Sequence, residues 1–461
     1  MSPISMLRLR SVFIALVVLA ISGGAVLLQS QRGPEGAAEA GEPELEAVGT
    51  QAELLGKMID GFGEVSMPRS QLSSQIEPLE KGPLSERLAH AVLVGEIFTF
   101  DDGATKARGL ELSDDEKAAG GEALRDAVAA MLDARAAGGD GAAAAAAVDA
   151  ERLAVVDAKL GYFSRMLKEE TAVEAVRALV VLLSVVGWYT VVFLGGSVGL
   201  VVLIVFLASG RTRATLAPAS DLRVGVVLGE TFVLWFALFL GLTVAMQFVG
   251  GGLGTEGRLG LSLFAMFASL AALAYPIMRG IPAAELRRAI GLHAGTGLLR
   301  EAGWGALCYF TAVPLLAVGL AMFALLSWIS TQVFGEQAEP SHPAVEMLAG
   351  SSALRIVLLY ALASVAAPIV EEIAFRGVFY GHLRAVFAPH RRLLSAFVAA
   401  AFSSFVFAVI HPQGVLFVPA LGGLAIGFCL YREWRSSLVA PMVAHGINNA
   451  VTMTIGLLLL S

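Results

Sequence analysis

The chain has 461 residues, of which 56% are hydrophobic and 15% are charged, and its formal net charge is −7. An average soluble domain has about 25% charged residues, so this composition excludes an ordinary soluble protein and indicates a polytopic membrane protein. The two cysteines, Cys308 and Cys429, both lie in apolar runs. We therefore predict two small buried hydrophobic side chains, with no disulfide framework and no cysteine metal site.

Residues 1–30 are predicted to form an N-terminal transmembrane anchor or a signal peptide. Arg8 and Arg10 precede an apolar run over residues 11–28, and this order fits either kind of segment. Residues 26–34 contain no clean pair of small residues for cleavage, which favours the uncleaved anchor. Because basic residues flank transmembrane segments on the cytoplasmic side, we expect the N-terminus to lie inside.

Residues 31–175 are predicted to form an acidic α-helical module outside the cytoplasm. Residues 31–170 carry 27 acidic and 14 basic residues, a net charge of −13, which leaves +6 for the rest of the chain. Residues 31–55 are rich in Gly, Ala, Glu and Pro and predict a flexible linker. A helical pattern then runs from about 83 to 170, with a helix start at Ser113 and a break at Gly138.

Residues 176–461 are predicted to form an all-α polytopic transmembrane helical bundle. The candidate spans are 177–208, 222–248, 259–278, 304–329, 353–370, 393–410, 414–431 and 436–460. With the anchor, the chain would have about eight or nine spans. Arginines gather in alternate loops, as expected for loops on the cytoplasmic side: Arg211 and Arg213; Arg279, Arg287, Arg288 and Arg300; Arg384, Arg391 and Arg392; Arg432 and Arg435.

The first chemical motif begins where the predicted 353–370 span ends. Glu372 and Arg376 are four residues apart on a helix and can pair on one face, while Glu371 points about 100° away. Glu371 would then be the less neutralised carboxylate, able to accept a proton from water. Alternatively, all three side chains form a charged helix end at the cytoplasmic headgroups.

His411 follows an apolar run and precedes Pro412, which ends a helix. It could lie beside Glu371 or serve as an interfacial cap, and Phe407, one turn earlier, could line the site or simply pack. A straight helix from Arg392 would carry His411 away from a glutamate at the cytoplasmic end of its span. We therefore expect a tilted helix or a deep cavity.

His445 and Asn449 are also four residues apart, on one face of the last span. Both side chains can donate hydrogen bonds, so they could stabilise the oxyanion that forms when water attacks a carbonyl. Alternatively, they are a polar pair that joins helices. Asn448 points about 100° away and is predicted to be structural.

These motifs, E-E-x-x-x-R, F-x-x-x-H and H-x-x-x-N in this order, resemble the CPBP or Abi family of intramembrane proteases, which includes the Rce1-type CAAX prenyl proteases. The resemblance covers roughly residues 350–455 and implies a glutamate protease that needs no metal or other cofactor. It implies that Glu371 and His411 activate a water. His445 and Asn449 would form the oxyanion hole, with Glu372, Arg376 and Phe407 in support.

Three other interpretations remain open. Glu371, His411 and His445 could hold zinc, although the sequence has no H-E-x-x-H motif. Ser403 and Ser404 lack a nucleophile signature and are predicted to pack between helices. The chain could also be a non-catalytic membrane immunity or scaffold protein. Glu230, a second intramembrane carboxylate, is predicted to bond between helices or to line a secondary site.

The predicted setting is the cytoplasmic (inner) membrane of a bacterium, as a multi-pass protein. The expected partners are membrane lipid, a peptide or membrane-protein substrate, and an extracytoplasmic partner of the 31–175 module. No nucleic-acid partner is expected. The sequence does not name the substrate, and prenylated proteins are not expected in a bacterium.

Overall fold

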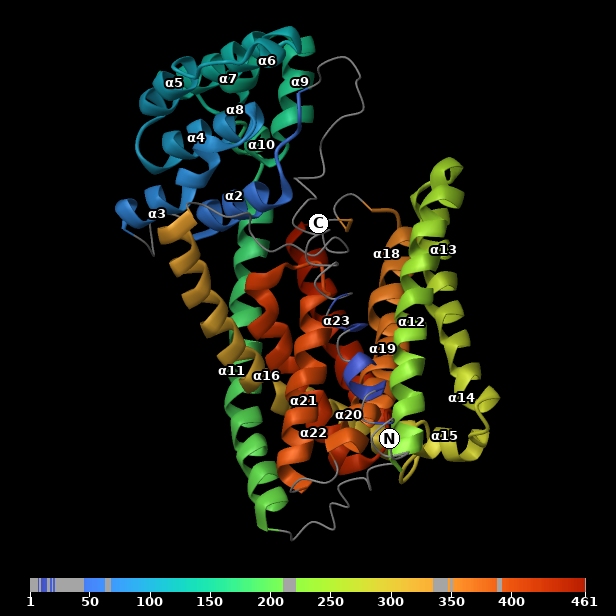
Figure 1. The fold of residues 1–461 in the computed structure, drawn as a ribbon. Coiled ribbons are helices and arrows are strands. Elements are labelled where there is room, and N and C mark those ends of the chain that lie inside the picture. The colour runs from blue at the N-terminus through green and yellow to red at the C-terminus, as the bar shows by residue number, and fades with distance from the viewer. Residues whose placement is uncertain are drawn as a thin grey trace. The chain divides into compact units, whose positions relative to one another are not determined.

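The computed structural model describes residues 7, 10–14, 17–18, 20, 45–62, 68–209, 221–334, 347–348, 351–387 and 392–460. The described residues form helices and no strands, which confirms the predicted all-α class (Figure 1). The chain divides into two compact units. We call residues 1–33 and 187–456 the membrane unit, and residues 34–186 and 457–461 the N-terminal unit.

The N-terminal unit consists of short helices. They are α2 (Thr50–Phe62), α3 (Arg69–Ile76), η2 (Glu77–Lys81), α4 (Leu84–Ile97), α5 (Phe100–Arg108), α6 (Asp114–Ala118), α7 (Gly121–Ala136), α8 (Gly141–Ala146), α9 (Ala150–Leu160) and α10 (Tyr162–Leu167). Ser113 forms the predicted cap, with a reciprocal bond from its own N–H to Glu116. The predicted break is also present, since α7 ends at Ala136 and Gly138 has a positive φ.

The predicted linker over residues 31–55 is wrong at its end, because α2 begins at Thr50. Ala52 and Ile59 of α2 are buried in the core of the unit, and this burial outweighs the linker-like composition. Most of the predicted linker, and most of the predicted anchor at 1–30, lies outside the described residues.

His90 of α4 is buried in the N-terminal unit. Its Nε2 atom lies 3.4 Å from Oε1 of Glu80, which also receives a hydrogen bond from Lys106. Burial, reinforced by the charge of Lys106, lowers the pKa of His90 from 6.5 to about 4. His90 is therefore neutral in the folded unit at physiological pH.

Helix α11 (Ala172–Ser209) begins in the N-terminal unit and ends in the membrane unit. The other helices of the membrane unit are α12 (Leu222–Val249), η3 (Gly250–Gly252), α13 (Thr255–Ser269), η4 (Leu270–Leu273), α14 (Ala274–Met278), α15 (Ala283–Ile290), α16 (Leu298–Phe334), α18 (Ala353–Tyr360), η5 (Ala361–Ala366), α19 (Ala367–Glu372), η6 (Ile373–Phe379), α20 (Tyr380–Phe387), α21 (Arg392–Val409), η7 (Val415–Phe417), α22 (Val418–Arg435) and α23 (Val439–Leu460).

Seven helical segments among the described residues are long and apolar enough to cross a membrane. They are Ala172–Phe206, Leu222–Gly252, Thr255–Met278, Leu298–Val333, Ala353–Phe387, Val415–Arg435 and Val439–Leu459. Large apolar side chains project from them into solvent, as expected for a lipid-facing surface; examples are Val191, Phe248 and Trp328. The chain is therefore a multi-pass integral membrane protein.

Two predicted spans differ from the structure. The predicted 393–410 span is a shorter apolar helix over Leu394–Val409. The predicted 353–370 span continues to Phe387, because Arg376 and Arg384 find partners inside the protein and do not end the helix. A count based on apolar runs alone therefore misjudges both segments.

Several predicted cytoplasmic segments meet at one end of the membrane unit. Arg10 and Arg279 both pair with Glu230 of α12. Arg432, at the end of α22, donates a 3.1 Å hydrogen bond from Nη2 to the carbonyl of Ala289. The N-terminal flank, the 279–300 loop and the end of α22 therefore lie on the same side, as the arginine pattern requires.

Candidate active site

The helical run Ala353–Phe387 is interrupted twice by π-helix, at η5 and η6. These segments enclose α19, which ends with Glu371 and Glu372. Pro368 has no N–H, so the carbonyl five residues earlier, Ala363, cannot receive its π-helical bond. The side chain of Asn449 donates to this carbonyl instead, over 2.7 Å. Such π-helical turns occur frequently at functional sites.

The sequence suggested that Glu371 lies at the cytoplasmic end of its span. This prediction is wrong, because Glu371 lies near the middle of the run Ala353–Phe387. The rise of about 1.5 Å per residue places Glu371 about 24 Å before Phe387, and His411 about 28 Å after Arg392. Because α21 packs back against α20 and η6, the two side chains reach a similar depth. The expected difficulty in bringing His411 to Glu371 therefore does not arise.

The predicted ion pair between Glu372 and Arg376 is present. Nη1 of Arg376 donates to Oε1 of Glu372 over 2.9 Å, and both side chains are fully buried. The guanidinium lies 4.3 Å from the ring centroid of Phe407 and 5.3 Å from that of Phe428. Phe407 therefore stabilises the buried cation as well as packing beside the site.

His445 joins this ion pair to Glu371. Its Nδ1 atom lies 3.0 Å from Oε1 of Glu372, and its Nε2 atom lies 3.9 Å from Oε2 of Glu371. The ring stacks on Phe428 and meets Phe407 edge to face. Since an ionised carboxylate only accepts hydrogen bonds, Nδ1 carries the proton given to Glu372. The other nitrogen then faces Glu371.

His411 also lies near Glu371. Its Nε2 atom lies 3.9 Å from Oε2 of Glu371, and its Nδ1 atom donates to the carbonyl of Phe407 over 2.5 Å. This bond fixes the tautomer, so Nε2 presents a lone pair toward the carboxylate when the ring is neutral. The structure therefore brings Glu371, His411 and His445 together.

Oε2 of Glu371 has no hydrogen-bond partner among the described residues, although the atom is buried. Its distance of 3.9 Å from each histidine nitrogen is too long for a direct bond. One water that makes two bonds of about 2.8 Å spans such a gap. Each of these two separations is therefore of a length that one bridging water matches.

Asn449 lies on the same face as His445 but is directed toward η5. Besides its bond to Ala363, it accepts a 3.2 Å hydrogen bond from Asn448. Gly446 lets α23 pack closely against η5, because a Cβ added at this position would lie 2.7 Å from the carbonyl oxygen of Ser364. An amide nitrogen has two hydrogens, so Asn449 keeps a second donor. Its role in an oxyanion hole stays a prediction.

The other residues with reactive side chains, two serines and two cysteines, pack between helices. Ser403 donates to the carbonyl of Phe375 over 3.3 Å, and Ser404 lies 3.8 Å from the sulfur of Cys429. Both cysteines are free and buried, as predicted. In the part of the chain that the structure describes, no three His, Cys, Asp or Glu side chains are grouped as a metal site.

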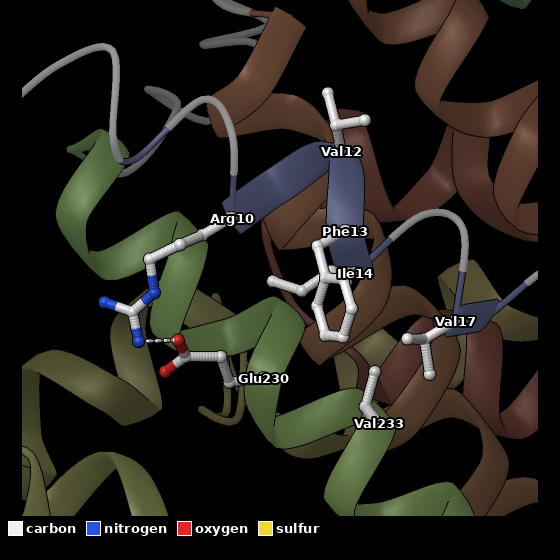
Figure 2. Close-up of a pocket in the computed structure, with 7 residues that line it drawn as sticks. All are labelled: Arg10, Val12, Phe13, Ile14, Val17, Glu230 and Val233. Atoms are coloured by element: carbon white, nitrogen blue, oxygen red, sulfur yellow. Dashed lines mark hydrogen bonds and ion pairs between the residues drawn. The ribbon is translucent and has the colours of Figure 1, made fainter. Parts of the chain in front are cut away.

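Glu230 bonds to side chains from two other segments of the membrane unit. It pairs with Arg10, and it receives a 2.9 Å hydrogen bond from Tyr275, which in turn accepts one from Arg279. Figure 2 shows the ion pair at the edge of a cavity of about 680 Å³. The cavity is lined by Arg10, Val12, Phe13, Ile14, Val17, Glu230 and Val233, none of which belongs to the predicted catalytic set.

Sequence reasoning missed the two connections that organise this site. The hydrogen bond between His445 and Glu372 joins helices 73 residues apart, and the stacking of Arg376 on Phe428 depends on α22. No local spacing predicts either contact. The only signal was that each residue is polar or aromatic within an apolar segment.

The sequence of the membrane unit matches known proteins over the segment that contains these residues. Residues 353–451 match the family model described as type II CAAX prenyl endopeptidase Rce1-like. A relative from Staphylococcus aureus (strain USA300), the membrane-embedded CAAX protease MroQ, is 26% identical over 151 residues. The match covers 32% of this chain and 59% of that protein. No solved structure gives a significant match. Residues 353–451 of this membrane protein are therefore similar to the Rce1-like CAAX prenyl endopeptidase family.

Proposed function

We propose that this chain is an intramembrane endopeptidase of the CAAX protease type. The observation that carries the proposal is the position of Oε2 of Glu371, 3.9 Å from the Nε2 atoms of both His411 and His445. A water held there is close to a proton acceptor and to two imidazoles. The match to Rce1-like proteins supports the same activity.

In the proposed reaction, the oxygen of this water attacks the peptide carbonyl carbon. Glu371 accepts the water proton, with His411 orienting the water through Nε2. The carbonyl oxygen becomes an oxyanion. When both nitrogens of His445 carry a proton, Nδ1 donates to Glu372 and Nε2 can donate to the oxyanion, together with Asn449.

Collapse of this intermediate breaks the C–N bond, and Glu371 returns its proton to the leaving amine. The products are a carboxylic acid and an amine, so protons balance without a further reactant. Glu372 and Arg376 hold His445 in place, and no step requires a metal. We therefore propose a glutamate-type mechanism that is independent of metal.

The proposed substrate is a peptide or a membrane protein that reaches the site from the lipid or from the cytoplasm. A pulldown with the inactive Glu371→Gln variant, which should retain bound substrate, would identify it. Purified protein should cleave the captured protein, and the variant should not. A chain that binds partners but cleaves none of them would be the immunity or scaffold protein.

We further propose that the protein lies in the cytoplasmic membrane of a bacterium with its acidic module outside. The basic loops would then lie inside. Cysteines introduced at Ala123 and Ala284, both exposed, can be labelled with an impermeant maleimide, because the native cysteines are buried. Ala123→Cys should react from outside and Ala284→Cys only from inside. The reverse pattern contradicts this orientation.

A further inference from the structure

The segment that joins two candidate spans, from Met278 to Leu298, is strongly basic. Residues 279–300 contain four arginines and a single acidic residue, Glu285. The arginines are Arg279, Arg287, Arg288 and Arg300. Because the segment connects the end of one span to the start of the next, it lies at a membrane surface.

Helix α15 within this segment is amphipathic. Leu286 and Ile290 are buried in the core of the membrane unit, whereas Arg287 and Arg288 are exposed. In Figure 1, α15 lies across the foot of α12 and does not run parallel to it. The orientation and the two-faced composition are those of an interfacial helix.

Three of the four arginines have no ion-pair partner among the residues that the structure describes. Arg279 is held by Tyr275 and Glu230, but neither Arg287, Arg288 nor Arg300 forms an ion pair with any residue that the structure describes. These cations are therefore available to an anion outside the protein.

Large exposed apolar side chains flank these cations along the chain. Met278 is 82% exposed, Leu298 is 63% exposed and Leu299 is 90% exposed. Free guanidinium groups beside exposed apolar side chains fit a ligand that has an anionic head and hydrocarbon chains. A soluble phosphate would satisfy only the arginines.

The buried face of α15 contacts the helix that carries the candidate site. A Cβ added to Gly377 of η6 would lie 3.1 Å from the carbonyl of Ile290, so the backbones are in close contact. The N–H of Leu438, just before α23, donates to the carbonyl of Gly291 over 2.9 Å. Helix η6 also carries Arg376, the partner of Glu372. Hence α15 packs directly against the helix that carries one member of the buried ion pair.

We propose that α15 is a docking surface for anionic phospholipid headgroups, and that lipid bound there holds η6 and raises the activity of the site. The docking is independent of the proposed function, whereas the effect on activity rests on it. Arg287 and Arg288 bind the phosphate, and the neighbouring apolar side chains contact the acyl chains.

The docking is tested by titrating phosphatidylglycerol or phosphatidylcholine into the full chain in detergent and following its thermal unfolding. Each arginine near an anionic surface contributes about five-fold in affinity, so Arg287→Gln with Arg288→Gln should weaken phosphatidylglycerol binding about 25-fold. The matched control, Arg125→Gln with Arg152→Gln, removes the same charge from α7 and α9 and should bind as the wild type does. Replacement of both α15 arginines by lysine should preserve most of the affinity.

Equal affinity of the wild type and the Arg287→Gln, Arg288→Gln variant for phosphatidylglycerol would overturn the docking proposal. The docking proposal would also be overturned if the wild type bound phosphatidylcholine as tightly as phosphatidylglycerol. The inactive Glu371→Gln variant should bind lipid normally, so this result does not depend on whether the chain is a protease.

The effect on activity is tested in nanodiscs. Peptide cleavage by the wild type should be several-fold faster with 30% phosphatidylglycerol than with phosphatidylcholine alone, and the double glutamine variant should lose this difference. If the wild type cleaves equally fast in both lipids, the proposed link between α15 and the site is wrong. If no protein cleaves in either lipid, the proposed function fails, while the binding result stands.

Discussion

Nδ1 of His445 lies 3.0 Å from Oε1 of Glu372, and this contact joins the buried ion pair to the candidate catalytic carboxylate. Glu372 thereby has two partners, since Arg376 donates to the same oxygen. The arrangement divides the two adjacent glutamates between different tasks. Glu372 orients a histidine, and Glu371 faces both histidines without a direct bond.

Removal of Arg376 should destabilise the protein strongly. Arg376→Ala leaves Glu372 buried without its counter-charge, which costs about 3–5 kcal/mol. Arg355→Ala is the matched control, because its ion pair with Glu256 is partly exposed and should contribute less than about 1 kcal/mol. Thermal unfolding in detergent measures both effects. Equal losses for the two variants would show that burial of the Glu372–Arg376 pair has no special importance.

Asn449 should contribute to the reaction as well as to the helix. We expect Asn449→Ala to lower kcat about 100-fold with little change in KM, because an oxyanion donor acts only in the transition state. Asn448→Ala, which removes only the donor to Asn449, should lower kcat far less. Cleavage kinetics at matched amounts of folded protein decide this. If Asn449→Ala loses stability but keeps its kcat, Asn449 has only a structural role, through its bond to Ala363.

Removal of metal should leave activity unchanged. The proposed mechanism uses Glu371 and two histidines to activate water, so exhaustive chelation followed by dialysis should not slow cleavage. Elemental analysis of the same samples is the control. Activity that falls with the metal content and returns when zinc is added would show that the three side chains are metal ligands.

The N-terminal unit should lose stability in mild acid through His90. The unfolded chain binds a proton to this ring near pH 6.5, but the folded unit does so only near pH 4. The stabilisation is therefore complete above pH 6.5 and is lost as the pH falls to about 4, by at most about 3 kcal/mol. Glu96 is exposed by surface area, but desolvation of its carboxyl raises its pKa to about 7, so this group acts oppositely over this range.

Comparison of the wild type with His90→Gln separates the two groups. Hydrogen exchange of α4, followed by mass spectrometry in the full chain, should show opening in acid that the variant lacks. If both proteins open equally between pH 6.5 and 4.5, His90 is not the responsible group.

Much of this architecture follows from the sequence because its signals are local. Long apolar runs predict the spans, the spacing of Glu372 and Arg376 predicts their pair, and Ser113 predicts a helix start. The depth of Glu371 could not be predicted from the sequence. Arg376 and Arg384 suggest the end of a transmembrane span, and only the structure shows that both have buried partners. The direction of Asn449 did not follow either, since it depends on a carbonyl that a proline leaves free.

The proposed mechanism depends on Glu371, which accepts the proton of the attacking water. The measurement compares peptide cleavage by purified wild type, Glu371→Gln and the control Glu256→Gln, which changes a partly exposed carboxylate, each at the same concentration of folded protein. We predict that the wild type and Glu256→Gln cleave at similar rates, and that Glu371→Gln is at least about 100-fold slower, the usual contribution of a general base. Cleavage by Glu371→Gln at the wild-type rate would show that Glu371 is not the proton acceptor.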